Sequence, residues 1–261
     1  MTKNIYTYKN ATITYIHNTI DVNKPTLVCL HGFLEHKGIF NFLFEDTYFK
    51  SYNLIAIDLL GHNESDTIGY IHTMEDQANM VYGLLTQLNI YKANILGHSL
   101  GGYVSLAFLT LYPKMVNKIC LLNSSTKADS EEKKINRLRG IELVKKNSSI
   151  FIQLAISNLF DEKTRLKYEQ EINDLKQIAL KNNANSLIAN MRGMMERPDT
   201  SYLLCNSNIF FIAGSSDQII PMQEIKDEAV PNNNSLFELN GYHMLWLEQP
   251  ESIKKILKEN L

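Results

Sequence analysis

The stretch that most constrains the fold of this chain is residues 97–102, Gly-His-Ser-Leu-Gly-Gly, because it joins two apolar runs without an intervening loop. The run before it, residues 93–96, is short and largely apolar like a buried strand, and the run after it, residues 103–109, continues as a helix. A turn from strand to helix this tight leaves no room for side chains beside the serine, which explains the flanking glycines. It also holds Ser99 in a strained backbone conformation. The stretch therefore predicts a strand that turns directly into a helix.

The rest of the chain repeats the alternation of strand and helix. Further short apolar runs, most of them without alternation, lie at residues 26–30, 54–57, 119–122, 209–212 and 235–239. Strands buried on both faces have this pattern. Helical spacing of apolar residues predicts amphipathic helices at residues 74–89 and 103–112 and a C-terminal helix after Pro250. Residues 5–17 alternate and predict an antiparallel hairpin at a sheet edge, with Asn10 in its turn. Together these elements predict an α/β fold with a mostly parallel, doubly wound sheet.

Residues 126–200 interrupt this alternation. They are rich in Lys and Glu, their composition favours helices throughout, and they contain no strand-like run. An insertion between strands of a parallel sheet predicts a cap over the carboxyl ends of the strands, where open α/β sheets bind ligands. The alternative is packing on the sheet edge without contact to a substrate. The predicted domains are a core of residues 1–125 and 201–261 and an inserted helical cap of residues 126–200. The first apolar face of the cap comprises Ile135, Leu138, Ile141, Leu143 and Val144.

Composition narrows the function classes. With 261 residues, 44% hydrophobic and 21% charged, the chain can bury a sizeable core. The net charge of -2 offers no basic surface for nucleic acid. The polar N-terminus lacks a secretory signal, and no uncharged apolar stretch reaches the roughly 18 residues that span a bilayer, so no membrane partner is expected. Cys29, Cys120 and Cys205 are odd in number and far apart, which predicts free thiols and a cytoplasmic location. Nothing indicates a metal or an organic cofactor, and a homodimer is left open.

The serine in this turn has the setting of a nucleophile elbow, in which a Gly-x-Ser-x-Gly turn exposes the hydroxyl. A serine hydroxyl is a poor nucleophile at neutral pH and needs a base that an acid orients. His243 is the only histidine C-terminal to Ser99, and Asp217 follows the apolar run at residues 209–212. In the elbow architecture the chain order is serine, acid, histidine. We therefore predict a triad of Ser99, Asp217 and His243.

Each partner of the serine also has a purely structural interpretation. Asp217 taken alone fits equally well as a cap of the helix that begins near Pro221. His243 taken alone fits a loop histidine bonded to backbone. Asp129 and Asp161, at the start of the predicted cap, are weaker candidates for the acid. The agreement of three independent positions with one geometry favours catalysis.

Acyl transfer also needs two hydrogen-bond donors for the developing oxyanion. The backbone N–H of Leu100, at the start of the helix after the serine, supplies one. The backbone N–H of Phe33, in the loop after the strand at residues 26–30, supplies the other. Gly32 lets this loop pass close to the serine, and His31 is predicted to fix the loop rather than act as a base. Candidates for substrate contact are His31, His98 and Trp246.

These residues together resemble the α/β-hydrolases, of the small, capped, esterase-like kind. The resemblance covers nearly the whole chain and includes residues 31–33, 57–65, 97–101, 214–217 and 241–243. The chain departs from the family at Leu60 and Asn63, where Pro and Gly are usual. Asn tolerates the left-handed conformation better than most residues, so the turn is expected to survive. The resemblance implies a serine hydrolase whose cap selects the substrate.

Serine at the elbow argues against the haloalkane dehalogenase and epoxide hydrolase branches, which resemble this fold but use Asp there. The first hypothesis is hydrolysis of a small carboxylic ester through an acyl-enzyme. The second is a lyase similar to the menaquinone-pathway synthase, a branch that holds carboxylate substrates with arginines. The cap region offers Arg137, Arg139, Arg165, Arg192 and Arg197. We interpret these arginines as solvated helix charges, which favours the ester hydrolase. A C–C bond hydrolase or a thioesterase with the same mechanism stays open, and the intact triad disfavours a non-catalytic receptor.

Overall fold

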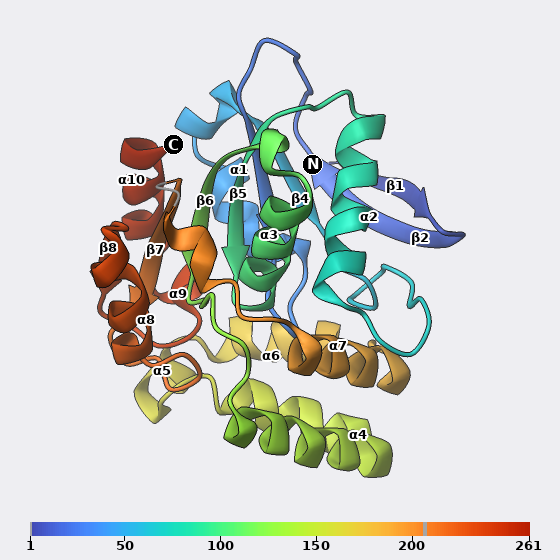
Figure 1. Ribbon diagram of the computed structural model, residues 1–261. Helices are drawn as coiled ribbons and strands as arrows, with labels where there is room; N and C mark the ends of the chain where they lie inside the picture. Colours follow the sequence, from blue (N-terminus) through green and yellow to red (C-terminus); the bar gives the residue numbers. More distant parts are fainter. Residues whose placement is uncertain (1, 206–207) are drawn as a thin grey trace.

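A mostly parallel sheet forms the centre of the molecule (Figure 1). In residues 2–205 and 208–261, which the computed structural model describes, eight strands form one sheet of order β1-β2-β4-β3-β5-β6-β7-β8. The strands are β1 (Thr2–Tyr8), β2 (Ala11–His17), β3 (Thr26–Leu30), β4 (Asn53–Ile57), β5 (Ala93–His98), β6 (Val116–Leu122), β7 (Ile209–Gly214) and β8 (Leu236–Leu239). The β1–β2 hairpin turns at Lys9 and Asn10, both with positive φ, and pairs antiparallel with β4. From β4 to β8 the neighbouring strands are parallel, so the predicted doubly wound sheet is confirmed.

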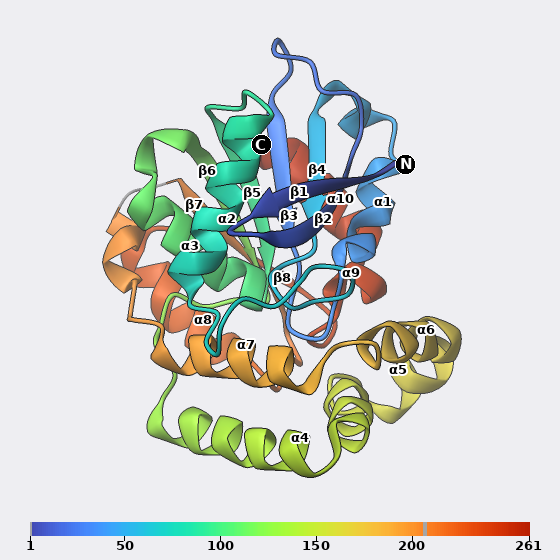
Figure 2. The same cartoon turned by 90° about the vertical axis from the view of Figure 1, so that its right-hand side faces the viewer.

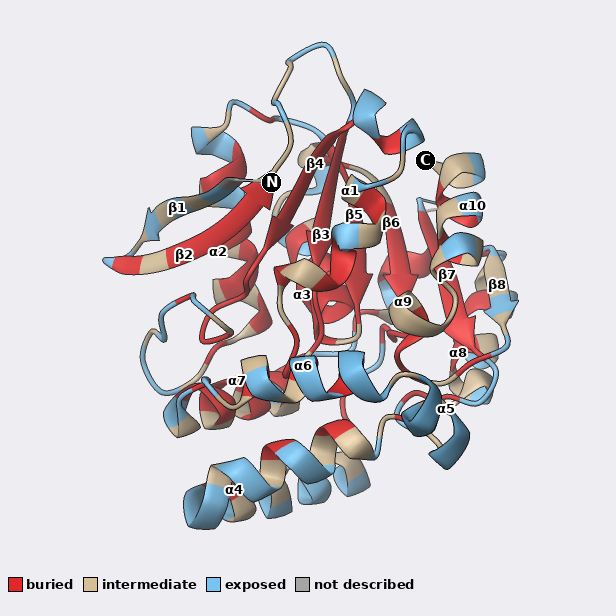
Figure 3. Ribbon diagram, turned by 180° about the vertical axis from the view of Figure 1, so that it is seen from behind, coloured by how far each residue is buried: buried red, intermediate tan, exposed pale blue. Residues whose placement is uncertain are grey.

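Alternate residues of the central strands face two separate hydrophobic cores, which explains why their sequences are continuously apolar. In β3, Val28 and Leu30 belong to one core, and Leu27 and Cys29 to the other. The first core is covered by α2 (Met74–Gln87), α3 (Leu100–Leu111) and α8 (Met222–Ala229), and the second by α1 (Asn41–Phe44), α9 (Leu245–Glu248) and α10 (Pro250–Asn260). Figure 3 shows the central strands β3 to β7 as buried over most of their length, whereas the edge strands β1 and β8 are more exposed.

Short 3-10 turns complete the core. They are η1 (Lys37–Phe40), η2 (Tyr48–Ser51), η3 (Pro113–Met115), η4 (Ser201–Cys205) and η5 (Val230–Asn232). The turn after β4 departs from the family pattern at Asn63, which has φ 49°. Its side-chain amide donates to Asp58 at 2.9 Å. Asn63 therefore adopts the left-handed conformation as predicted.

Among the described residues between β6 and β7, four α-helices lie across one end of the core (Figures 1 and 2). They are α4 (Glu131–Ser157), α5 (Glu162–Lys167), α6 (Glu169–Ala179) and α7 (Ala184–Glu196). In Figure 2, α7 lies next to the core and α4 forms the outer layer. The backbone of α4 is not helical at Asn147, whose side-chain oxygen accepts from the N–H of Ile150 and restarts the helix. These helices cover the end of the sheet at which the parallel strands finish.

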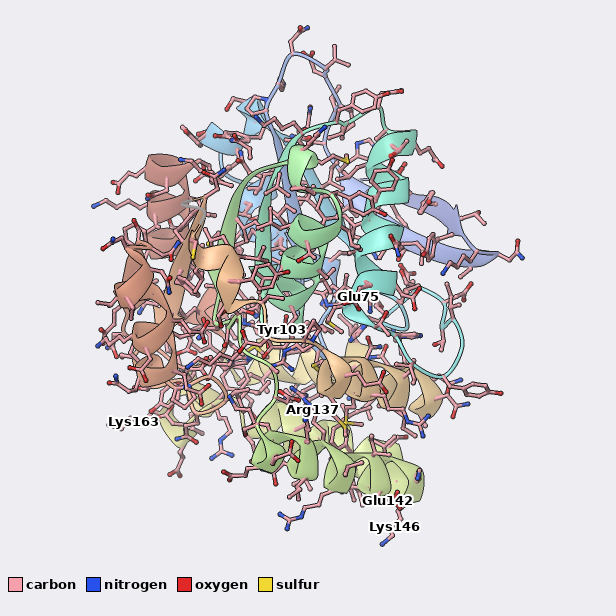
Figure 4. All side chains as sticks on the ribbon, in the orientation of Figure 1. Glu75, Tyr103, Arg137, Glu142, Lys146 and Lys163 are labelled. Carbon is pink, nitrogen blue, oxygen red and sulfur yellow. The ribbon has the colours of Figure 1, made fainter. Side chains whose placement is uncertain are left out.

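The predicted apolar face of α4 is only half buried. Ile141 and Val144 are buried, whereas Ile135 and Leu138 are 48% and 51% exposed. Because α4 is the outermost layer, only its side toward α6 and α7 is covered, and Figure 4 shows Glu142 on the outside. The prediction was wrong for Ile135 and Leu138, since a helix with apolar residues on two sides does not reveal which side meets the core. Among the described residues, no helix is both long and apolar enough to cross a membrane.

Candidate active site

Ser99 lies at the turn from β5 into α3, with φ 49° and ψ -113°. Its backbone N–H donates to the carbonyl of Leu122 at 3.0 Å, which fixes the turn against β6. A Cβ at Gly97 would lie 2.5 Å from the carbonyl oxygen of Gly101, and one at Gly101 would lie 2.0 Å from that of Leu30. No side chain fits at such distances, so both glycines are required. The strand-to-helix turn predicted from the sequence is therefore present, with a serine in a strained conformation at its tip.

His243 and Asp217 form a buried pair beyond β8 and β7. The ring Nδ1 of His243 lies 2.8 Å from Oδ2 of Asp217. The same oxygen accepts from the side-chain amide of Asn123 at 2.7 Å, and Oδ1 accepts from the N–H groups of Ile219 and Ile220 at 2.8 and 3.1 Å. Burial alone would raise the pKa of Asp217, but the charge and hydrogen bond of His243 outweigh it and lower the pKa. An ionised, oriented carboxylate thus holds the imidazole.

The other two candidate acids have different partners. Asp129 is buried against two arginines, and Asp161 caps α5 by accepting from the N–H of Thr164 at 2.8 Å. Asp217 is not the cap of α8, whose N-cap residue is Pro221. In the described part of the chain, Asp217 is therefore the one of the three that bonds to His243.

Ser99 and His243 line the same cavity of about 530 Å³ between the core and the cap helices. Its apolar wall combines core and cap side chains, among them Phe33, Phe151, Leu159, Met191, Met194 and Ile219. Within the described residues no hydrogen bond joins the Ser99 hydroxyl to His243. Such bonds often tighten only when a substrate is bound. The arrangement brings a serine and an oriented imidazole to one half-open cavity with both apolar and charged walls.

The loop after β3 fixes the direction of the Phe33 N–H. The carbonyl of Gly32 accepts from the N–H of Glu35 at 3.2 Å and lies 2.8 Å from the ring Nδ1 of His31. In a trans peptide the N–H points away from the carbonyl, so these bonds set the orientation of the Phe33 N–H as well. The N–H of Leu100 is in the first turn of α3 and has no partner within the helix. Phe33 lines the same cavity as Ser99, and Leu100 directly follows Ser99 in the chain. Their role as oxyanion donors stays a prediction.

The three candidates for substrate contact all bond to protein groups. His31 is fully buried outside the cavity wall, and its ring nitrogens face a backbone carbonyl and a backbone N–H. The indole N–H of Trp246 donates to Glu35 at 3.0 Å. His98 lines the cavity, but its ring nitrogens lie within hydrogen-bond distance of Glu35 and of the carbonyl of His243. Contact with a substrate stays a prediction for these residues, whose polar atoms serve the framework of the site.

Sequence reasoning missed Glu35 and Asn123. Asn123 directly follows β6 and has φ 44°, which lets its amide reach Asp217. A polar residue immediately after an apolar run, at the same sheet edge as the other candidates, was the available signal. The signal for Glu35 was a charged residue in the short loop that contains Phe33. Neither residue belongs to a motif, so its partner could not be inferred.

The charged cluster around Asp129 corrects our interpretation of the cap arginines. Arg197 is buried, donates to Asp129 at 2.7 Å and stacks 3.8 Å above the ring of Tyr103. Arg137, labelled in Figure 4, also pairs with Asp129, and both Arg137 and Tyr103 line the cavity. Burial alone would raise the pKa of Asp129, but the arginines lower it. Arg197 is therefore not a solvated charge, because the chain that leaves α7 carries it into the core. Arg192 remains partly exposed beside Tyr70.

The cysteines offer no alternative nucleophile in the cavity wall. Cys29 and Cys120 are free and buried in β3 and β6, and burial raises the pKa of both thiols. Cys205 is free and exposed. Among the described residues, no group of three or more His, Cys, Asp and Glu side chains is arranged to hold a metal ion.

Comparison with known proteins agrees with this fold. Residues 25–147 match the model of a family described as the alpha/beta hydrolase fold. YugF, an uncharacterized hydrolase of Bacillus subtilis, is 33% identical over 121 residues, 46% of this chain and less than half (44%) of that relative. A 2-hydroxy-6-oxononadienedioate/2-hydroxy-6-oxononatrienedioate hydrolase of Pseudomonas putida is 28% identical over 79% of this chain and 76% of its own length. The structure of a thermophilic esterase from Thermogutta terrifontis aligns with a TM-score of 0.87 at 27% identity, over 99% of this chain and 97% of the esterase. The chain has the α/β-hydrolase fold.

Proposed function

We propose that this protein is a serine hydrolase that cleaves a small, uncharged carboxylic ester through an acyl-enzyme. The observation that carries the proposal is the buried 2.8 Å hydrogen bond between Asp217 and His243, with His243 in the wall of the cavity that Ser99 also lines. An oriented, charge-stabilised imidazole beside a serine is what nucleophilic acyl transfer requires.

In the proposed reaction, the Ser99 hydroxyl attacks the ester carbonyl carbon and transfers its proton to Nε2 of His243. Asp217 stabilises the imidazolium that results. The N–H groups of Phe33 and Leu100 bind the oxyanion of the tetrahedral intermediate, which collapses to the acyl-enzyme. The alcohol leaves with the proton from His243. Water then attacks the acyl-enzyme, with His243 again as base, and releases the carboxylic acid.

The charges in the cavity wall support an uncharged substrate. Arg137 pairs with Asp129, and Lys133 pairs with Glu224 at 2.7 Å. A substrate carboxylate would have to displace one of these internal partners. The same pairing argues against the lyase alternative, which depends on free arginines. A C–C bond hydrolase is the second candidate, favoured by the Pseudomonas putida relative, which is named for a dicarboxylate substrate.

A series of p-nitrophenyl esters from acetate to laurate tests the proposal, with the hemisuccinate ester as the anionic member. We expect kcat/KM to be highest for short to medium uncharged acyl groups, and turnover to vanish in Ser99→Ala. Turnover of a 2-hydroxy-6-oxodienoate without ester hydrolysis would favour the C–C bond hydrolase instead.

A further inference from the structure

A buried ion pair lies directly behind the proposed catalytic residues. Nδ1 of His98 is 2.8 Å from Oε2 of Glu35, and Nε2 of His98 is 2.9 Å from the backbone carbonyl oxygen of His243. The side chains of Glu35 and His98 are each 1% exposed. A carboxylate and a carbonyl are both acceptors, so both ring nitrogens of His98 are placed to donate. This is the geometry of an imidazolium ion paired with a carboxylate.

The hydrogen bonds of Glu35 keep it ionised. Its Oε1 accepts from the indole N–H of Trp246 at 3.0 Å, and its Oε2 accepts from the backbone N–H of Gly32. Burial alone would raise the pKa of Glu35, but the charge and hydrogen bond of His98 outweigh it and lower the pKa to about 2. Burial alone would lower the pKa of His98, and Glu35 raises it. The other titratable groups that face the pair are His31, His36, Asp217 and His243.

The pair connects three separate loops of the site. Glu35 holds the backbone of Gly32 next to Phe33, and His98 directly precedes Ser99 in the elbow. The ring of His98 also holds the backbone of His243. Between these contacts, Leu34 has φ 67°, a strained conformation for a side chain of this kind. Strain like this persists only where the surrounding structure fixes it.

We propose that Glu35 and His98 are a positioning pair. They hold the Phe33 N–H at a fixed position relative to Ser99 and His243, and so determine the geometry of the oxyanion hole. The proposal rests on the proposed ester hydrolysis. Neither residue touches the reacting atoms. A buried ion pair contributes little net stability because desolvation offsets its attraction. This pair is bonded to all three loops of the site, so we assign it to positioning those loops.

The variant Glu35→Gln tests the pair because it removes the charge at nearly constant shape. We expect kcat for the best ester to fall at least about tenfold with KM within about twofold, since losing an entire oxyanion donor costs about 10²- to 10³-fold. The affinity for an alkyl trifluoromethyl ketone, which forms an oxyanion on Ser99, should fall by the same factor as kcat/KM. The affinity for the product carboxylic acid should not change. A merely structural role would not separate these two affinities.

Trp246→Phe removes one donor to Glu35 and serves as the milder variant if Glu35→Gln does not fold. The kcat of Trp246→Phe should also be lower than that of the parent. Asp46→Asn is the matched control, because Asp46 is an ion-paired carboxylate beside Lys254 and Lys258, outside the cavity wall. Its kcat and ketone affinity should equal those of the parent.

The charge of His98 has a readout independent of activity. In ¹⁵N NMR spectra at pH 8, both ring nitrogens of one histidine should be protonated, and that signal should vanish in His98→Gln. A neutral His98 in the parent protein overturns the proposal. So does a folded Glu35→Gln or Trp246→Phe variant with parental kcat and ketone affinity, or one in which only KM rises. A parent that neither hydrolyses esters nor binds the ketone refutes the proposed function. An active parent whose variants keep parental kcat and ketone affinity refutes only the positioning role of Glu35 and His98.

Discussion

At the scale of single residues, the surroundings of Asp217 explain how one carboxylate can serve both its loop and the imidazole. One oxygen accepts from two backbone N–H groups, and the other accepts from Asn123 and His243. The loop bonds hold the carboxylate in place. The second oxygen is left to select the tautomer of His243 that can take a proton at Nε2.

Asp217→Asn should therefore keep the fold and lower kcat by about 10⁴-fold, because the amide no longer selects that tautomer or stabilises the imidazolium. Steady-state kinetics on the best ester measure the loss. The matched control is Asp161→Asn, which alters the cap of α5 and should stay within a few-fold of the parent. Parental activity in Asp217→Asn would mean that Asp217 only stabilises its own loop and does not act in catalysis.

Glu35 also predicts a pH dependence of stability. Its pKa falls from 4.5 to about 2 on folding, so between these pH values the unfolded chain binds the additional proton. The stability that Glu35 contributes is complete above about pH 4.5 and is lost as the pH falls toward 2. The difference in unfolding free energy between the parent and Glu35→Gln, measured with urea, should shrink over this range. A difference that is constant from pH 6 to pH 2.5 would contradict the assignment.

The sequence was informative for residues that occupy a motif or follow a strand in a known order, such as Ser99 and His243. It was uninformative for residues whose role depends on a distant partner. Glu35 and His98 are 63 positions apart, and Asn123 and Asp217 are 94 apart. The periodicity of apolar residues along the sequence does not reveal such pairs, because only the folded sheet brings the ends of these strands together.

At the scale of elements, the cap helices determine the space available to the acyl group. Phe151 on α4 lines the cavity, and its ring lies 6.3 Å from that of Phe33. Phe151→Ala should shift the preferred ester toward longer chains. Each methylene newly accommodated contributes about 0.8 kcal/mol, or about a fourfold gain in kcat/KM. The p-nitrophenyl ester series measures the shift.

The neighbouring residue offers the control. Ile150 is 48% exposed on α4, so Ile150→Ala should leave the chain-length preference unchanged. An unchanged preference in Phe151→Ala would place the acyl group elsewhere.

Strands and cap helices differed in how well their sequences predicted burial. Residues 26–30 are apolar on both sides because β3 has a core on each face, so the pattern has one interpretation. In α4, Ile135 and Ile141 look alike in the sequence, but one is exposed and the other buried. A helix that borders solvent can carry apolar residues on both sides, and its neighbours α6 and α7 determine which side is covered.

At the scale of the whole molecule, Arg197 joins the cap to the core. It lies just after α7, pairs with Asp129 before α4 and stacks on Tyr103 of α3. Arg197→Ala should lower the free energy of unfolding by up to about 3 kcal/mol, the lower end for a broken buried ion pair, because Arg137 still pairs with Asp129. Urea denaturation measures the change.

Arg192→Ala is the control, because Arg192 is partly exposed on α7. It should change the free energy of unfolding by no more than about 0.5 kcal/mol. Equal, small effects of both substitutions would mean that Arg197 does not hold the cap.

The alternation of strands and helices was sufficient to predict the doubly wound core. The size and charge of the cavity were not predictable. They depend on how α4 and α7 pack over the sheet and on Asp129, which pairs with arginines that the sequence alone suggested were solvated.

The most direct measurement is labelling with a fluorophosphonate, located by mass spectrometry, in the parent and in Ser99→Ala. The account predicts one label per chain, on Ser99, with loss of ester hydrolysis in step with labelling. Ser99→Ala should take up no label and lose about 10⁶-fold in kcat, because the triad acts as a unit. A label on another serine, or an alanine variant that still hydrolyses esters, would contradict the account.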